Sequence, residues 1–302
     1  MTGEQSAAAR VALAASMISF SAVFVKIVHV GPIISGFYRV FFGGLILSAV
    51  VAVRRERIWK NRSWFMQAAA CALFFVLDLL VWHHSIMYVG PGLATILANF
   101  QVFCLGLFGI AVFGERLSLR LILSIPLAVG GLFMLVGLNS TPMGKHEWTG
   151  IWLGLSAAVF YSAFLLTLRR LQTLKNPLTA TANLSVVCLV SAVLIGAYIV
   201  WEGDSFQIPD ALSLAGLLSY ALCSQVIGWI LITGSLPKIR ASLAGLLLLL
   251  QPALAFVWDV MFFGKQTTSV NWVGAVVTLV AIYVGATARG AGPARKTPWA
   301  HR

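Results

Sequence analysis

The chain repeats itself at an offset of 150 residues, and this duplication limits its possible folds more than any other feature. Gln101-Val102 stands the same distance before Phe113-Gly114 as Gln251-Pro252 stands before Phe263-Gly264. The two pairs are separated by 150 residues in a chain of 302. The sequence therefore consists of two related halves, and any fold must be built from two similar units.

The composition indicates a membrane protein. Apolar residues make up 60% of the chain and charged residues 10%, with a mean hydropathy of +0.92, whereas soluble domains contain about 25% charged residues. A hydrocarbon core about 30 Å thick requires about 20 apolar residues per helix. The runs of this length are 11–28, 33–53, 65–82, 92–113, 121–138, 150–168, 180–201, 212–232, 241–263 and 270–288. They are continuous and lack the alternation of barrel strands. They predict an all-α integral membrane protein with ten transmembrane helices.

Ten helices and one duplication give two repeats of five helices. The first repeat is expected over residues 11–138 and the second over 150–288, with an N-terminal segment at 1–10 and a disordered basic tail at 289–302. Because five is odd, the second repeat enters the bilayer in the opposite direction. Inverted repeats are typical of alternating-access transporters, whose substrate site lies between the repeats near the bilayer midplane.

The net charge of +12 is explained by membrane topology. With the N-terminus inside, 17 of the 21 Lys and Arg fall in cytoplasmic segments. The expected outer loop after the seventh helix instead carries Glu202, Asp204 and Asp210. This asymmetry follows the positive-inside rule and predicts a multi-pass membrane protein with both termini in the cytoplasm. It gives no reason to expect a nucleic-acid partner.

Several classes of function find no support in the sequence. The cysteines lie inside apolar runs without C-x-x-C spacing, which predicts small buried hydrophobic residues and not disulfides or zinc ligands. Asp78, His83 and His84 have no second group of ligands at metal-binding spacing. The loops are too short for a nucleotide-binding module, and the chain has no H-E-x-x-H motif. We therefore expect neither a metal, a cofactor, an ATP-driven mechanism nor an enzyme.

The charged residues inside the spans are the first candidates for a substrate site. Arg39, Asp78 and Asp259 each cost about 2.5–3.5 kcal/mol at mid-helix on insertion scales, so they face protein or water. Arg39 and Asp78 lie at similar depth, which allows a mutual ion pair. The alternative is that Arg39 receives a substrate carboxylate.

The remaining candidates are aromatic, amide and imidazole side chains within the spans. Gln101 and Gln251 are equivalent in the two repeats, and His83 follows the last residue of the third expected helix. The expected cavity lining is Trp82, His83, Gln101, Tyr161, Tyr220, Gln225, Trp229 and Gln251. Other tryptophans near expected helix ends predict an interfacial belt: Trp59, Trp64, Trp148, Trp152, Trp201 and Trp272.

The segment Phe113-Gly114-Glu115-Arg116-Leu117-Ser118, together with ten helices in two inverted repeats, resembles EamA-type members of the drug/metabolite transporter superfamily. Two departures are Gly264-Lys265, where a second Gly-Glu is common, and Val102, where proline is common. The resemblance implies a central cavity formed mainly by helices 1, 3, 4, 6, 8 and 9. Within the superfamily, the length of the chain and its aromatic residues are most similar to those of bacterial inner-membrane exporters of amino acids, including aromatic amino acids.

The expected function is export of small metabolites, above all amino acids with aromatic or apolar side chains, by a monomer or weak dimer in the lipid bilayer. The alternatives are a proton-coupled drug or metabolite antiporter and, from another class, a lipid flippase. An ion pair with Arg39 would keep Asp78 charged. On that basis we expect transport down the substrate gradient without obligatory proton exchange.

Overall fold

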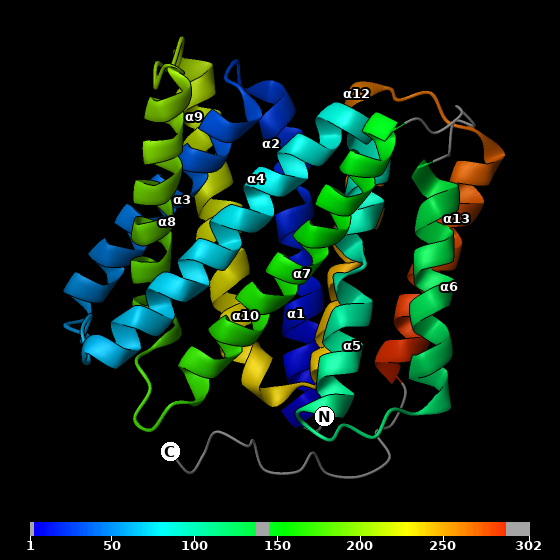
Figure 1. Cartoon of the computed structure of the whole chain (residues 1–302), viewed down its shortest axis with the longest axis horizontal. Helices are drawn as coiled ribbons and strands as arrows, with labels where there is room; N and C mark the ends of the chain where they lie inside the picture. The colour runs from blue at the N-terminus through cyan, green and yellow to red at the C-terminus, as the bar shows by residue number, and fades with distance from the viewer. Residues whose placement is uncertain (1–2, 137–144, 288–302) are drawn as a thin grey trace.

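The structure is a computed structural model that describes residues 3–136 and 145–287, and its elements in these ranges are all helical (Figure 1). The elements are α1 (Gly3–Ser19), α2 (Ser21–Ile27), α3 (Pro32–Val53), α4 (Arg62–Asn99), α5 (Gln101–Ala111), α6 (Leu119–Val136), α7 (Lys145–Thr173), α8 (Ala180–Glu202), α9 (Ala211–Tyr220), η1 (Ala221–Gly228), α10 (Trp229–Ser235), η2 (Leu236–Lys238), α11 (Ala241–Leu248), α12 (Leu250–Phe263) and α13 (Ser269–Thr287). The prediction of an all-α membrane fold is confirmed. The expected tail at 289–302 lies outside the described residues.

These elements form ten crossings. Nine helical stretches in the described chain are long and apolar enough to span a bilayer, and one of them, Arg62–Ala111, has 50 residues. At 1.5 Å per residue it would measure about 75 Å, more than twice the hydrocarbon core. The stretch is broken at Gly90, whose φ of 76° and ψ of 163° suit a residue without a Cβ. It therefore supplies two crossings.

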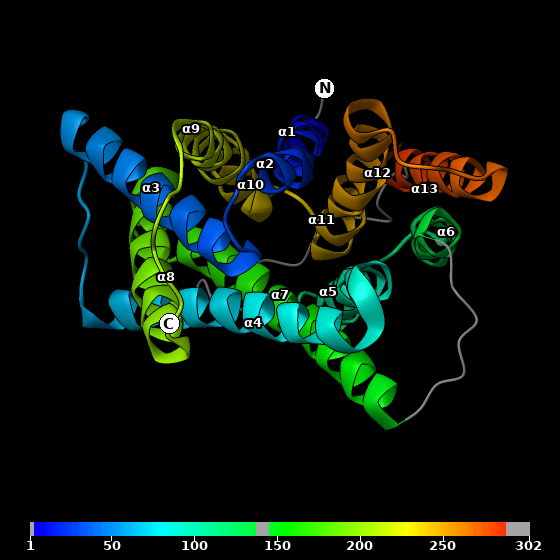
Figure 2. The same ribbon diagram turned by 90° about the horizontal axis from the view of Figure 1, so that it is seen from above.

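The two repeats run in opposite directions through the bundle. In Figure 1, α1 starts at the lower edge and α7 starts at the upper edge. The last helices of the repeats, α6 and α13, lie side by side and are antiparallel. Figure 2 shows the other neighbouring pairs from above, with α4 against α7, α3 against α8 and α5 against α11. The pairs α3–α8 and α6–α13 are repeat-related at the 150-residue offset, so the second and fifth crossings of the two repeats pack against each other.

One end of the bundle collects the basic connections. The segments 54–61, 112–118, 174–179 and 238–240 all lie at the lower edge of Figure 1, with the start of α1. We call this end the basic face. The opposite face carries the breaks at 28–31, 90 and 264–268 and the acidic connection 203–210. The charge asymmetry of the sequence is therefore a real separation in space.

Five of the six tryptophans expected in the interfacial belt are exposed, as a belt requires. Trp59, Trp148, Trp152, Trp201 and Trp272 are exposed, but Trp64 is only 1% exposed. Its Nε1 donates to Oδ1 of Asn183 at 2.8 Å, and Asn183 is itself fully buried. The prediction for Trp64 is wrong because a partner on α8 satisfies its indole N–H inside the protein.

Candidate functional site

Four crossings are interrupted inside the bundle, and the three predicted glutamines lie at three of these interruptions. The first crossing breaks at Phe20, the fourth at Phe100 and the ninth at Leu249. Gln101 directly follows the second of these breaks, and Gln251 lies two residues after the third. A third predicted glutamine, Gln225, lies at a further interruption, the π-helix Ala221–Gly228 of the eighth crossing. Discontinuous helices of this kind free backbone groups and frequently form binding sites in transporters.

Arg39 occupies an aromatic and polar environment in the bundle interior. Its Nη1 donates to the hydroxyl of Tyr220 at 3.1 Å. Its guanidinium carbon lies 5.2 Å from the ring centre of Phe75 and 5.3 Å from that of Tyr220. Its Nε is buried and has no hydrogen-bond partner among the described residues. The cation is thus held in place by rings while one donor remains unused.

Asp78 does not form the ion pair with Arg39 that the sequence allowed. The two residues are close enough for an electrostatic interaction, but the ion pairs of the described chain join other residues. Arg39 is instead turned toward Tyr220 on α9. Asp78 lies 16 residues into α4, about 24 Å along its axis, and still keeps accessible surface. The expectation of transport without proton exchange rested on this ion pair, and the structure does not support that reason.

Tyr161 connects this region to the second repeat. Its ring contacts Trp229 edge-on at 6.5 Å between centroids, and Trp229 contacts Phe164 at 5.0 Å. Its hydroxyl lies beside the Gln251 side chain and within electrostatic range of Arg39 and Asp78. Elements of both repeats therefore meet at this residue.

Gln101 and Gln225 tie neighbouring helices to this region. The Gln101 Nε2 donates to the carbonyl of Gly245 on α11 at 3.2 Å. The Gln225 Nε2 donates to Sγ of Cys188 on α8 at 3.1 Å. Both amides keep a buried carbonyl oxygen without a partner among the described residues.

Several predicted site residues carry unused polar atoms. In the described part of the chain, six of the ten carry a buried polar atom without a hydrogen-bond partner: Arg39, His83, Gln101, Gln225, Trp229 and Gln251. Buried polar groups are normally paired, so such atoms call for water or a ligand. These six atoms are the groups that the candidate site can offer to water or a ligand.

The predicted residues differ in their exposure. Gln101, Tyr220, Gln225 and Trp229 are buried. The partly exposed members are Arg39, Asp78, Trp82, His83, Tyr161 and Gln251. In this conformation the second group presents the accessible surface, and the first group lies behind it.

The third crossing is longer than expected, which moves His83 inward. The sequence placed the helix end at Trp82, but α4 continues to the break at Gly90. The Nδ1 of His83 donates to the Leu79 carbonyl at 2.9 Å, while its Nε2 is buried without a partner in the described residues. This local hydrogen bond makes an imidazole tolerable inside the helix. The ring also contacts Trp82, with centroids 5.0 Å apart.

Three residues near the site were missed by sequence reasoning. Phe75 lies under Arg39, Phe164 packs between Phe75 and Trp229, and Cys188 accepts from Gln225. Their residue types are ordinary in apolar helices, so the sequence carried no signal that distinguished them. Only the packing of α4, α7 and α8 brings them together.

Other candidates lie elsewhere or do not assemble. Asp259 pairs with Lys26 at 2.7 Å near the opposite face. The described residues contain no group of three His, Cys, Asp or Glu side chains suited to a metal. A groove of about 450 Å³ between α5 and α7 is lined by Phe108, Val159 and Thr167, among others, and by none of the predicted site residues.

Comparison with known proteins identifies the class first. A solved crystal structure superposes with a TM-score of 0.82 over 94% of this chain and 99% of its own, at 15% identity, which shows a shared fold. The transporter YwfM of Bacillus subtilis is 24% identical over 84% of this chain and 83% of its own length. The threonine/homoserine exporter RhtA of Salmonella typhimurium is 28% identical over 82% of this chain and 79% of its own. The fold and these relatives define a multi-pass membrane transporter.

The family follows from a direct match. The model of the EamA-like transporter family matches this chain twice, over residues 5–137 and 148–286. The chain belongs to the EamA-like transporter family. The resemblance seen in the Gly114-Glu115 segment and the helix count is thereby confirmed.

Proposed function

We propose that the protein exports zwitterionic metabolites, principally amino acids with aromatic or apolar side chains, across the bacterial inner membrane. The observation that carries this proposal is the set of unused polar atoms around Arg39, held between the two repeats by aromatic rings. The relative RhtA is named as an exporter of threonine and homoserine. Its similarity supports an amino acid as the substrate class.

The two charges of the site match the two charges of an amino acid. Arg39 and Asp78 are near each other but unpaired in the described structure, so each retains capacity for a partner. Arg39 would bind the carboxylate, and Asp78 would bind the ammonium group. Charge-assisted hydrogen bonds of this type are stronger than neutral ones. Trp82 and Tyr161, both partly exposed, would contact the substrate side chain.

The translocation mechanism we propose is alternating access. Opposed repeats can rock around a central site and expose it to each side in turn. The positive-inside rule makes the basic face cytoplasmic, with both termini on that side. Export then begins at the basic face and ends at the opposite face.

The proposal is tested by flux in proteoliposomes loaded with labelled amino acids. Arg39→Gln and Asp78→Asn should each raise KM about 10- to 100-fold, because a lost hydrogen bond to a charged group costs about 1.5–3 kcal/mol. Trp82→Ala and Tyr161→Ala should weaken flux of phenylalanine more than flux of threonine. Arg54→Gln and Trp152→Ala serve as controls, since both residues are exposed outside the site.

The same vesicles distinguish the alternatives. Labelled phospholipid that changes leaflet without amino-acid flux would contradict the exporter and support a flippase. Accumulation of cationic drugs driven by a pH gradient would support a proton-coupled drug antiporter. Wild-type rates in the Arg39 and Asp78 variants would remove both residues from the site.

A further inference from the structure

Glu115 is a buried carboxylate that the proposed substrate site does not use. It is 6% exposed and follows Gly114, whose φ of 61° turns the chain at the end of the fourth crossing. Its Oε1 accepts from the backbone N–H of Ala241 at 2.6 Å. Its Oε2 accepts from the Ser242 hydroxyl at 2.7 Å and from the Ser242 N–H at 3.4 Å. The carboxylate therefore caps the first turn of α11, where it satisfies free donors and complements the helix dipole.

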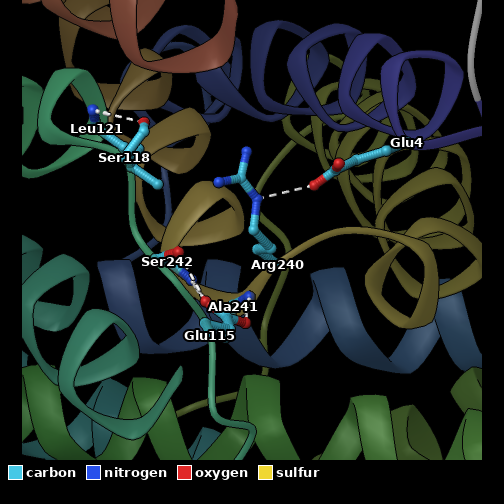
Figure 3. Close-up of polar contacts among 7 residues, drawn as sticks. All are labelled: Glu4, Glu115, Ser118, Leu121, Arg240, Ala241 and Ser242. Atoms are coloured by element: carbon cyan, nitrogen blue, oxygen red, sulfur yellow. Dashed lines mark hydrogen bonds and ion pairs between the residues drawn. The ribbon is translucent and has the colours of Figure 1, made fainter. Parts of the chain in front are cut away.

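This cap joins the two repeats at the basic face. Glu115 belongs to the first repeat, whereas α11 begins the fourth crossing of the second. Figure 3 shows a second link beside it, in which Nε of Arg240 bonds Oε1 of Glu4 at 2.9 Å. Arg169 of α7 lies over the ring of Phe113 at 4.4 Å and adds a third link. Three contacts across the repeat boundary thus gather within one small region.

Space for the carboxylate is provided by Gly109. A Cβ at this position would lie 2.4 Å from Oε2 of Glu115, which no real packing allows. The backbone reinforces the arrangement, because the Glu115 N–H donates to the Gly109 carbonyl at 2.9 Å. The cap is therefore built from a glycine, a turn and a carboxylate that fit one another.

On the opposite face, the equivalent turn at Gly264-Lys265 has a similar backbone but different side chains. At the 150-residue offset, Lys265 corresponds to Glu115, Asp259 to Gly109 and Pro91 to Ala241. The Lys265 N–H donates to the Asp259 carbonyl at 3.3 Å, as its counterpart does to Gly109. However, lysine cannot accept hydrogen bonds and Pro91 has no N–H to donate. Lys265 instead lies over the ring of Phe256 at 5.3 Å.

We propose that Glu115 is a latch that holds the basic face closed, and that its absence from the opposite repeat biases the resting transporter toward opening at the opposite face. The latch must release α11 each time the substrate site is exposed to the basic face. The inference rests on the alternating-access cycle of the proposed function. Glu115 acts through α11 and not on the substrate, so it is a positioning residue for the cycle.

The test measures distances between spin labels in nanodiscs without substrate. One pair of labels, at Arg116 and Lys238, reports on the basic face, and a second pair, at Met87 and Lys265, reports on the opposite face; all four side chains are exposed. The wild type should show a single short population at the basic face. Glu115→Ala should convert part of it to a longer distance, with an equal fraction shortening at the opposite face. Ser242→Ala, which removes one bond, should give a smaller shift of the same kind.

The matched control is Glu202→Ala, which removes one exposed carboxylate at the other end of the bundle. It should leave both distance distributions unchanged. If the Glu115 and Ser242 variants kept the wild-type distances, the latch would be wrong. It would also be wrong if the basic-face distances became longer without shorter distances at the opposite face. If the wild type moved no amino acid in proteoliposomes while the Glu115 variant still showed the distance changes, the substrate class would be contradicted and the latch would remain supported.

Discussion

Single buried polar residues decide how this apolar bundle fixes its helices relative to one another. The bond between Trp64 and Asn183 joins α4 to α8, and Asn183 also donates from Nδ2 to the carbonyl of Leu178 at 3.2 Å. Away from water, each of these groups would be costly without its partner. A tryptophan that the sequence assigned to the membrane interface is therefore a structural link in the core.

At this scale we predict that Trp64→Phe destabilises the protein by about 1–3 kcal/mol, because it keeps an aromatic ring but leaves Oδ1 of Asn183 unpaired. Trp59→Phe is the control, since Trp59 is 56% exposed, and it should change the unfolding free energy by less than about 0.5 kcal/mol. Unfolding in mixed detergent micelles measures both values. Equal effects of the two variants would show that the hydrogen bond contributes nothing.

At the scale of elements, the crossings are held by backbone approach where residues are small. The α6–α13 contact brings Gly131 so near to α13 that a Cβ would lie 2.5 Å from Oγ1 of Thr278 and 2.8 Å from the carbonyl of Gly274. The Thr278 hydroxyl also lies 3.3 Å from the carbonyl of Ala128. Close packing of this kind drives helix association in lipid, where no hydrophobic effect separates helices from the acyl chains.

The adjacent glycines of α6 provide a matched pair for the second prediction. Gly131→Ala should cost about 1–3 kcal/mol, because backbone atoms of α13 cannot rotate away from the new methyl group. Gly130→Ala meets nothing within 4 Å and should gain up to about 1 kcal/mol from helix propensity. Thermal unfolding in detergent compares them. If Gly130→Ala were the more damaging, the α6–α13 contact would be wrongly placed.

At the scale of the whole molecule, the two faces differ in charge as the sequence anticipates. The basic face gathers the connections rich in Arg and Lys, while the connection from α8 to α9 holds Glu202, Asp204 and Asp210. Asp210 also caps α9, since Oδ1 accepts from the Ser213 N–H at 2.7 Å, and its pKa is lowered by its bond to His29 and by that N–H. The acidic side chain thus remains charged and orders its loop.

The topology prediction follows from this separation. Single cysteines are placed at Arg57 and Asp204 in a chain whose four native cysteines are replaced. A maleimide that cannot cross the membrane, added to intact cells, should label position 204 and reach position 57 only after the cells are permeabilised. Labelling of 57 but not 204 from outside would invert the orientation and with it the direction of export.

The sequence by itself determined the ten crossings, the inverted duplication and the separation of charge. Apolar run length and loop charge depend on the bilayer and act locally along the chain. It also indicated Arg39, Asp78 and the two glutamines, because polar residues in lipid require protein or water around them. The continuation of α4 to Gly90 was hidden, since Trp82, His83 and His84 resemble a helix end in sequence.

Only the tertiary structure decided which polar groups meet. Arg39 bonds Tyr220 and not Asp78, and Glu115 bonds the start of α11, because those choices depend on helix rotation and close packing across 126 or more residues of sequence. The interruptions at Phe100 and Leu249 and the π-helix around Gln225 arise in the same way. The periodicity of a helix predicts which of its faces is buried. Which side chain that face contacts depends on how all the other helices of the bundle pack around it.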